Sequence, residues 1–376
     1  MAWLGGWLYR KEITLSRASG AVSNYQMKLL IGESSGASGE NVDCGGHCLS
    51  SFNDIRFTTA DGTTLLDYWI ESISGATPNQ LATIWIEFDS IGTSATTFYM
   101  YYGNASATAY SNGANTFIVF DDFERGSDGD TIGGNWTETV AHVHISTEQK
   151  YAGSRAAKVV GGTGQAAATI PLMAESGIYA IRGRVFKEDA AGANIFTHGN
   201  GTKLLLIAYA ATEEIQYYDG SFRGTGQYPS YNTWHLLEVL NINFTSGTFD
   251  VYLNGSLIKS GASMRASATA ANTVRIQGDA DADQDFWLDN FIVRNWRAIE
   301  PAWGSWGSEE YNPPLEADQT EAVILTDTFE PLHLVDQTAE QVTVTDQFDG
   351  DMNRRNVTEQ VTMTDEMKGF DYHGKQ

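Results

Sequence analysis

The chain has 376 residues, of which 38 are glycine, and aromatic residues make up 12% of it. This length favours two or three domains, and the composition is typical of turn-rich β-sandwiches. A net charge of −24 argues against nucleic-acid binding, which needs clustered lysine and arginine. The densest apolar run, residues 204–209, is far too short to cross a bilayer, so membrane insertion is not expected.

The first hundred residues alternate apolar and polar side chains in four segments, 7–15, 53–71, 82–88 and 97–104. Turn residues separate these segments, so the pattern predicts an antiparallel β-sandwich over residues 1–112. The segments resemble an uncharacterised family of β-domains of unknown function, and the resemblance covers about residues 5–112. Members of that family precede concanavalin-like modules in large surface proteins and in structural proteins of phages and archaeal viruses.

A second alternating region runs from residue 116 to 298 and predicts a second antiparallel sandwich. Within it, the Asn254-Gly255 pair between two alternating segments predicts a hairpin turn. Segments 233–238, 249–255 and 287–293 resemble a concanavalin-like jelly roll of the laminin-G or pentraxin kind, which implies a lectin-like module. The predicted fold class is therefore all-β, with two antiparallel β-sandwich (jelly-roll) domains in series.

Residues 299–319 are rich in small residues and proline, and they are predicted to form a linker. The alternative is that Trp303 and Trp306 fold back onto a sandwich. The acidic tail that follows, 320–376, contains three similar segments that start at intervals of 19 residues. Each segment has one apolar face that is too small to fold alone, so we expect it to pair with other virion subunits or with copies of this chain. A flexible acidic tail is the alternative. The predicted assembly residues are Val323, Leu325, Val342, Val344, Val361 and Met363.

Both cysteines lie in one loop, Cys44-Gly-Gly-His-Cys48. A disulfide or two free thiols are favoured over a metal site, because zinc needs four ligands and no second Cys/His pair follows at the spacing of a zinc finger. The N-terminus has no basic segment followed by an apolar stretch, so no signal peptide is expected. Cell lysis, or a dedicated signal-less secretion, is the expected route to a virion or extracellular location.

Acidic residues near both ends of the second domain predict a structural Ca²⁺ site, and calcium is the one cofactor expected. Residues 121–124 open the domain, and the closing strand should lie beside them. Carboxylates from both ends could share one ion, because calcium prefers oxygen ligands. Ordinary acidic turns are the alternative. The predicted ligands are Asp121, Asp122, Glu124 and Asp289.

Aromatic residues cluster around the glycine-rich loop 219–230. Sugars bind against exposed aromatic rings that have polar neighbours, so this loop is a candidate site for a host surface glycan or receptor. The alternative is that these aromatic residues pack into the core. The predicted contact residues are Tyr217, Tyr218, Phe222, Arg223, Tyr228 and Tyr231.

No catalytic residues are predicted. Glucanases of the concanavalin-like fold carry their carboxylates on one strand as Glu-x-Asp-x-Glu, and the nearest counterpart, Glu87-Phe-Asp89, lies in the first domain and lacks the third carboxylate. The sequence favours a non-enzymatic structural or adhesion protein of an extracellular assembly. A virion protein of the tail-fibre, head-fibre or decoration type with a lectin-like module is the first hypothesis. A carbohydrate-binding cell-surface adhesin is the alternative, and a glycan-active hydrolase is a weaker one.

Overall fold

The structure is a computed structural model, and it describes residues 2–36, 39–140, 142–161, 166–175, 179–188, 193–199, 203–209, 214–278 and 285–313. These residues form four β-sheets and one short helix, so the predicted all-β fold is confirmed. Among them, no helix has both the length and the apolar character needed to cross a bilayer. The predicted repeat tail, with its assembly residues from Val323 to Met363, lies outside the described residues.

The first sandwich is built from a six-stranded and a four-stranded sheet. The larger sheet contains β1 (Tyr9–Ser16), β4 (Arg56–Thr58), β5 (Leu65–Leu66), β8 (Thr96–Tyr102), β24 (Ala302–Trp306) and β25 (Glu310–Tyr311). Its order is β24-β1-β8-β4-β5, and β25 also pairs with β1. The smaller sheet contains β2 (Val22–Gly32), β3 (Val42–Asp43), β6 (Tyr68–Ser74) and β7 (Leu81–Ile91), in the order β3-β2-β7-β6.

Period-two alternation determines which face of each strand enters the core of the first sandwich. In β7, the side chains of Ile84, Ile86 and Phe88 are completely buried in this core. Trp85 lies on the other face of the same strand and belongs to a separate cluster. The smaller sheet therefore has apolar side chains on both faces, which indicates that its outer face is covered as well.

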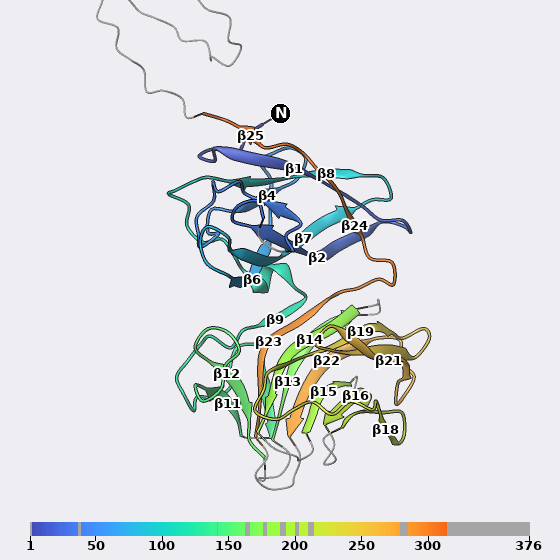
Figure 1. The fold of residues 1–376 in the computed structure, drawn as a ribbon. Helices are drawn as coiled ribbons and strands as arrows, with labels where there is room; N and C mark the ends of the chain where they lie inside the picture. Colours follow the sequence, from blue (N-terminus) through green and yellow to red (C-terminus); the bar gives the residue numbers. More distant parts are fainter. Residues whose placement is uncertain are drawn as a thin grey trace, which may run out of the picture. The chain divides into compact units, whose positions relative to one another are not determined.

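The structure differs from the predicted linker of 299–319, because residues 302–311 form two strands of the first sandwich. Figure 1 shows β24, in orange, beside β1, in blue. Leu15 pairs with Trp303 and Ile13 pairs with Trp306, with a register shift between the two pairs. This bulge allows two tryptophans three residues apart to pack against the same core. Proline and small residues predicted a linker, but the packing of the two partly buried indoles on the core outweighs that signal.

The second sandwich is built from an eight-stranded and a seven-stranded sheet. The larger sheet contains β9 (Val119–Asp121), β11 (Val143–Ser146), β12 (Ala156–Val159), β14 (Tyr179–Lys187), β19 (His235–Asn243), β20 (Thr248–Leu253), β21 (Ser256–Ser263) and β23 (Phe286–Asn295). Its order is β11-β12-β23-β14-β19-β20-β21, and β9 pairs with β23. The smaller sheet contains β10 (Thr137–Val140), β13 (Ala167–Glu175), β15 (Ala193–Gly199), β16 (Lys203–Tyr209), β17 (Ile215–Tyr218), β18 (Phe222–Gly224) and β22 (Ala271–Gly278). Its order is β10-β13-β22-β15-β16-β17-β18.

Two local predictions for the second sandwich are confirmed. The hairpin turn between β20 and β21 is at Asn254 and Gly255, with φ angles of 49° and 80°. These positive angles are the ones that an Asn-Gly turn adopts readily. The opening strand β9 lies beside the closing strand β23, with Asp121 paired to Phe291.

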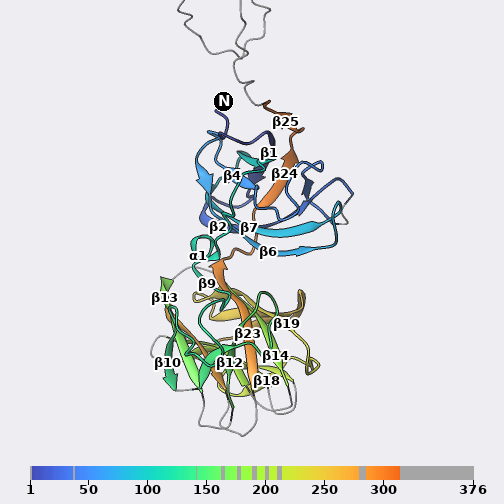
Figure 2. The same ribbon diagram turned by 90° about the vertical axis from the view of Figure 1, so that its left-hand side faces the viewer.

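A short helix, α1 (Gly113–Thr116), connects the two sandwiches. Asn112 caps its N-terminus, because the Asn112 side chain accepts a hydrogen bond from the backbone N–H of Asn115. The helix contacts β6 and β7 of the first sandwich and β9 of the second, and Figure 2 shows it in this position. The connection therefore packs against both sandwiches.

Candidate functional site

An aromatic cluster occupies the junction between the two sandwiches. Trp69 on β6 and Trp85 on β7 each lie 5.8 Å from the ring of Phe117, measured between ring centroids. Ile292 on β23 completes the cluster, and all four side chains are buried. The outer face of the smaller sheet of the first sandwich is therefore covered by residues of the second sandwich and of the connection.

A buried ion pair crosses the same junction. The Oε1 atom of Glu71 lies 2.6 Å from Nη2 of Arg182, and Oε2 of Glu71 accepts a hydrogen bond of 2.8 Å from Nε1 of Trp85. Burial would raise the pKa of Glu71, but the charge of Arg182 and these hydrogen bonds outweigh burial and lower it. Arg182 also lies 3.3 Å from Glu238 on the neighbouring strand β19.

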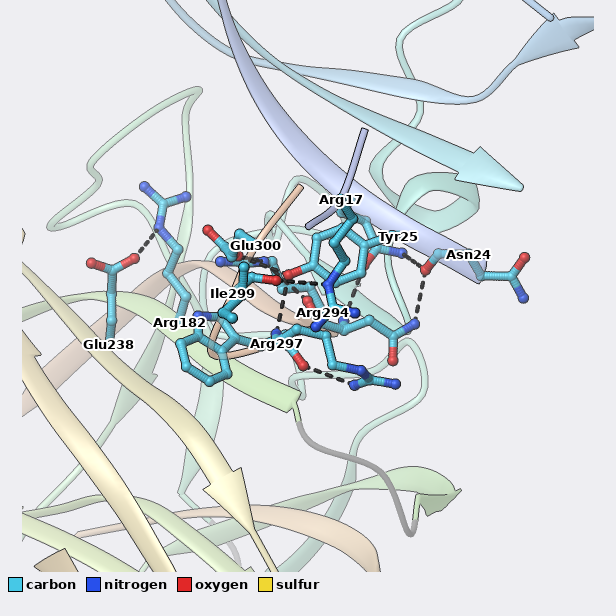
Figure 3. Close-up of polar contacts among 12 residues, drawn as sticks. Arg17, Asn24, Tyr25, Arg182, Glu238, Arg294, Arg297, Ile299 and Glu300 are labelled. Atoms are coloured by element: carbon cyan, nitrogen blue, oxygen red, sulfur yellow. Dashed lines mark hydrogen bonds and ion pairs between the residues drawn. The ribbon is translucent and has the colours of Figure 1, made fainter. Parts of the chain in front are cut away.

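A second set of polar contacts surrounds the end of β23, and Figure 3 shows its side chains converging. The hydroxyl of Tyr25 donates to Oε1 of Glu300 at 2.9 Å, and Nη1 of Arg294 donates to the same oxygen at 2.8 Å. The side chain of Gln26 accepts a hydrogen bond of 3.0 Å from the backbone N–H of Asn295. Both backbone and side-chain groups thus hold the two sandwiches together.

A cleft with a volume of about 480 Å³ opens beside this junction. Its wall combines two aromatic rings, one aliphatic side chain, three charged groups, two amides, a hydroxyl and several small residues. The lining residues are Trp69, Ser111, Asn112, Gly113, Ala114, Phe120, Asp121, Asp122, Arg125, Gly134, Asn135 and Ile170. Both sandwiches and the connecting helix therefore contribute to one concave surface.

Two glycines shape the wall of the cleft. A Cβ atom on Gly113 would lie only 2.3 Å from the ring of Phe120, so a larger residue there would push this ring away. Gly134 has a φ of +63°, and a Cβ atom on it would lie 3.0 Å from Cζ of Arg125. Glycine permits both the close approach and the positive φ.

The three charged side chains of the cleft have different roles. Asp121 accepts hydrogen bonds of 2.6 and 2.9 Å from Arg125 and one of 2.8 Å from Nε1 of Trp136. Asp122 accepts a hydrogen bond of 3.3 Å from the backbone N–H of Glu124, and no ion pair involves it within the described residues. Burial, together with the charges of Asp121 and Glu124, raises the pKa of Asp122. Asp122 is therefore the carboxylate of the cleft that has the most capacity for a ligand.

The four predicted calcium ligands are engaged separately. Glu124 accepts hydrogen bonds from the backbone N–H groups of Ser154 and Arg155 at 2.7 and 2.9 Å. Asp289 accepts backbone hydrogen bonds from Tyr151 at 2.8 Å and from Ala152 at 3.1 Å, and burial raises its pKa to about 6. In the described part of the chain, no three His, Cys, Asp or Glu side chains gather as a group that could hold a metal. Calcium binding stays a prediction.

The predicted aromatic site divides between the core and the surface. Tyr217 is buried against Phe249 at a ring distance of 6.2 Å, which favours the core alternative for this residue. Alternation along β17 explains this, because Ile215 and Tyr217 share the inward face.

The remaining aromatic residues of this group lie nearer the surface. Phe222 and Tyr228 are 54% and 61% exposed, and Tyr218 packs edge-to-face on Phe222 at 5.0 Å. Arg223 pairs with Asp219 at 3.2 Å, and Tyr231 is half-buried. These residues stand on the hairpin of β17 and β18 and in the segment after it, away from the residues that line the junction cleft.

The sequence predicted either a disulfide or two free thiols at Cys44 and Cys48. Both residues are free thiols in the structure. Cys44 is completely buried in the core of the first sandwich, and Cys48 is half-buried. Burial raises the pKa of Cys44 well above its ordinary value, with a further contribution from Cys48. The loop also positions His47, whose ring stacks on Tyr9 at 4.0 Å.

Sequence reasoning did not single out Trp69, Phe120 or Asn135 as site residues. The alternation of β6 places Trp69 on the face opposite the core, and this signal could have marked it as exposed or covered by a partner. It could not show that residues from 111–136 would form the opposite wall, because their position beside Trp69 depends on tertiary packing.

Comparison with known proteins gives a family match over part of the chain. A domain of unknown function, DUF2341, matches residues 51–139. This match confirms the resemblance of the first sandwich in part, and it extends beyond the predicted boundary at 112, through α1 to β10. No curated protein matches the chain.

Several solved structures are distantly similar to the chain. A sialidase is 9% identical with a TM-score of 0.38, and the match covers 54% of this chain and 20% of that one. A carbohydrate esterase from the Shiga toxin-encoding bacteriophage phi24B is 14% identical with a TM-score of 0.34, covering 42% and 89%. The CBM22-1 xylan-binding domain from Paenibacillus barcinonensis Xyn10C is 16% identical with a TM-score of 0.28, covering 47% and 93%. At these values, neither a ligand nor an activity follows from the likeness.

Proposed function

We propose that this chain is a non-enzymatic structural and adhesion protein of an extracellular assembly, and that its junction cleft binds a glycan. The composition of the cleft supports this most directly. Half-buried Phe120 offers apolar ring surface, while Asp122 and Asn135 offer hydrogen-bonding groups beside it. Sugars need this combination, because their C–H faces pack on rings while their hydroxyls require polar partners. A volume of about 480 Å³ is within the range of small-ligand sites.

Binding without catalysis is the reading that the cleft chemistry favours. Glycoside hydrolysis uses two carboxyl groups, one on each side of the scissile bond. Two carboxylates line the cleft, but Asp121 is committed to Arg125 and to the indole of Trp136. This leaves Asp122 to contact a ligand.

The proposed setting is a virion, in which the chain would be a fibre or decoration protein with a lectin-like, concanavalin-like second sandwich. The buried pair of Glu71 and Arg182 supports a structural role, because it joins the two sandwiches by more than their covalent connection. A cell-surface adhesin would use the same cleft. Detection of the chain in purified phage particles, encoded beside capsid and tail genes, supports the virion, whereas its detection on intact host cells without phage supports the adhesin.

Glycan binding is tested by presenting the full chain to an array of bacterial and host-cell glycans. We expect binding that is lost in Asp122→Ala and in Asn135→Ala, two substitutions of partly or fully exposed side chains. Phe222→Ala and Tyr228→Ala, at the exposed aromatic residues of the second sandwich, serve as matched controls and should retain binding. If the control variants lose binding and the cleft variants keep it, the glycan site lies at the hairpin of β17 and β18 instead. If the folded chain binds no glycan, the proposed function is wrong.

A further inference from the structure

The charges of the junction cleft restrict the class of glycan that it can hold. Its single cation, among the described lining residues, is Arg125. Both terminal nitrogens of Arg125 donate to Asp121, Nε donates to the backbone oxygen of Ile132 at 2.8 Å, and Nη2 also contacts the oxygen of Gly133 at 3.2 Å. A carboxylate on a ligand would therefore find a guanidinium whose charge is already paired and four of whose five N–H groups are engaged.

Asp122 adds a negative charge that no cation balances within the described residues. A carboxylate-bearing sugar would meet this like charge at short range and the net charge of −24 of the whole chain at long range. A neutral sugar meets no such repulsion. Its hydroxyl groups can donate to both oxygens of Asp122, and these oxygens are strong acceptors above the raised pKa of this carboxyl group, where it is ionised.

The amides of the cleft distinguish a hydroxyl ligand from an ammonium ligand. Asn135 is exposed and can both donate and accept, as can a sugar hydroxyl. An ammonium group only donates, so it would satisfy Asp122 but would make no hydrogen bond with the amide N–H groups of Asn135, which would stay hydrated. The donor and acceptor pattern therefore favours hydroxyl groups over a cation.

We infer that the cleft selects a neutral saccharide with two adjacent hydroxyls and rejects uronic and other acidic sugars. The two hydroxyls donate to Asp122 while a C–H face of the sugar packs on Phe120. This inference rests on the proposed function, because it names the ligand class of the same site. It assigns Asp122 the role of a specificity-determining residue.

The test compares neutral sugars with acidic sugars of matched stereochemistry. Calorimetric titration of the full chain would use linear tetrasaccharides of glucose, mannose and galactose, their uronic acid counterparts, and a glucosamine tetramer, all at 0.15 M salt. We expect at least one neutral tetrasaccharide to bind about tenfold or more tightly than its uronic counterpart, because like charges disfavour the wrong partner.

The variant Asp122→Asn removes the charge and keeps the shape of the side chain. We expect it to weaken neutral binding about tenfold and to narrow the gap between the neutral and uronic sugars, because a neutral acceptor is weaker than an ionised one. The control variant Asp219→Asn removes a half-buried carboxylate on the hairpin of β17 and β18, outside the cleft lining, and should change neither affinity. An unchanged melting temperature for Asp122→Asn shows that its effect is on the ligand.

Each other outcome overturns a distinct part of the reasoning. Uronic sugars that bind as tightly as neutral ones refute the ligand class and leave the proposed glycan binding intact. Preference for the glucosamine tetramer shows that Asp122 selects an ammonium group and likewise refutes the inference. If the folded chain binds no tetrasaccharide of any class, both the inference and the proposed function are wrong.

Discussion

Replacing Glu71 with glutamine should loosen the junction and lower the stability of the described part of the chain. The side chains of Glu71 and Arg182 are 5% and 9% exposed, and their charged atoms lie 2.6 Å apart. Removing one partner of a buried ion pair typically costs about 3–5 kcal/mol, because the other charge stays buried. Arg182 retains Glu238 at 3.3 Å, so we expect the low end, about 3 kcal/mol. Glutamine also preserves the acceptor for Trp85.

Calorimetry and urea denaturation measure this effect. If about 300 residues unfold together, a loss of about 3 kcal/mol lowers the melting temperature by about 5 °C, from an unfolding entropy of about 2 cal/mol/K per residue. We expect the wild-type chain to melt in one transition. In Glu71→Gln we expect this single transition at the lower temperature.

A double-mutant cycle isolates the ion pair from the other effects of substitution. Glu71→Gln and Arg182→Met should show a coupling energy of about 2 kcal/mol or more, because the two groups contact each other directly. Arg223→Met, which removes an exposed arginine from the hairpin of β17 and β18, is the matched control and should leave the melting temperature unchanged. A Glu71→Gln variant as stable as the wild type, or a coupling energy near zero, would refute this account of the junction.

Three further predictions concern the first sandwich. Burial and the neighbouring carboxylates raise the pKa of Glu87 to about 7, above its ordinary value of 4.5. The contribution of Glu87 to stability is therefore fully present below about pH 4.5, and it is lost as the pH rises through 7. Glu87→Gln should therefore be more stable than the wild type at pH 8, by about 1–2 kcal/mol after allowance for solvent screening, and equally stable at pH 4.5. A difference in stability that widens toward low pH would contradict this. A thiol reagent should modify half-buried Cys48 in the native chain and buried Cys44 only after unfolding, as counted by mass spectrometry. Equal rates of modification of the two cysteines in the native chain would show that the core around Cys44 opens easily. A chain that ends at residue 299 lacks β24 and β25 and should lose several degrees of melting temperature, because the core loses the cover of Trp303 and Trp306; a chain that ends at residue 313 is the control.

Local patterns were sufficient to predict most of the fold. The alternating segments predicted strands, and Asn254-Gly255 predicted its own hairpin, because the residues that determine these features are close in sequence. The pairing of β24 with β1 could not be predicted in this way, since it joins residues about 290 positions apart and depends on a bulge. The sequence contains Trp303, but it does not indicate which strand Trp303 would pair with.

The candidate site was harder to predict because its residues come from several elements. The acidic segment 121–124 predicted a calcium site, whereas in the structure Asp121 forms an ion pair with Arg125, four residues later. Tyr217 was predicted as a contact residue although alternation along β17 already placed it with the core face. Trp69 and Phe120 are 51 positions apart in the sequence, and their rings lie 4.9 Å apart in the structure. Such neighbours follow from tertiary packing, which a single sequence does not display.

The most direct test of the junction cleft is a crystal structure of the full chain with the tightest-binding neutral tetrasaccharide. We predict electron density for a sugar ring against Phe120, with two adjacent hydroxyls within hydrogen-bonding distance of the Asp122 carboxylate. Density at the exposed rings of Phe222 and Tyr228, with the junction cleft free of sugar at saturating concentration, would contradict the central claim.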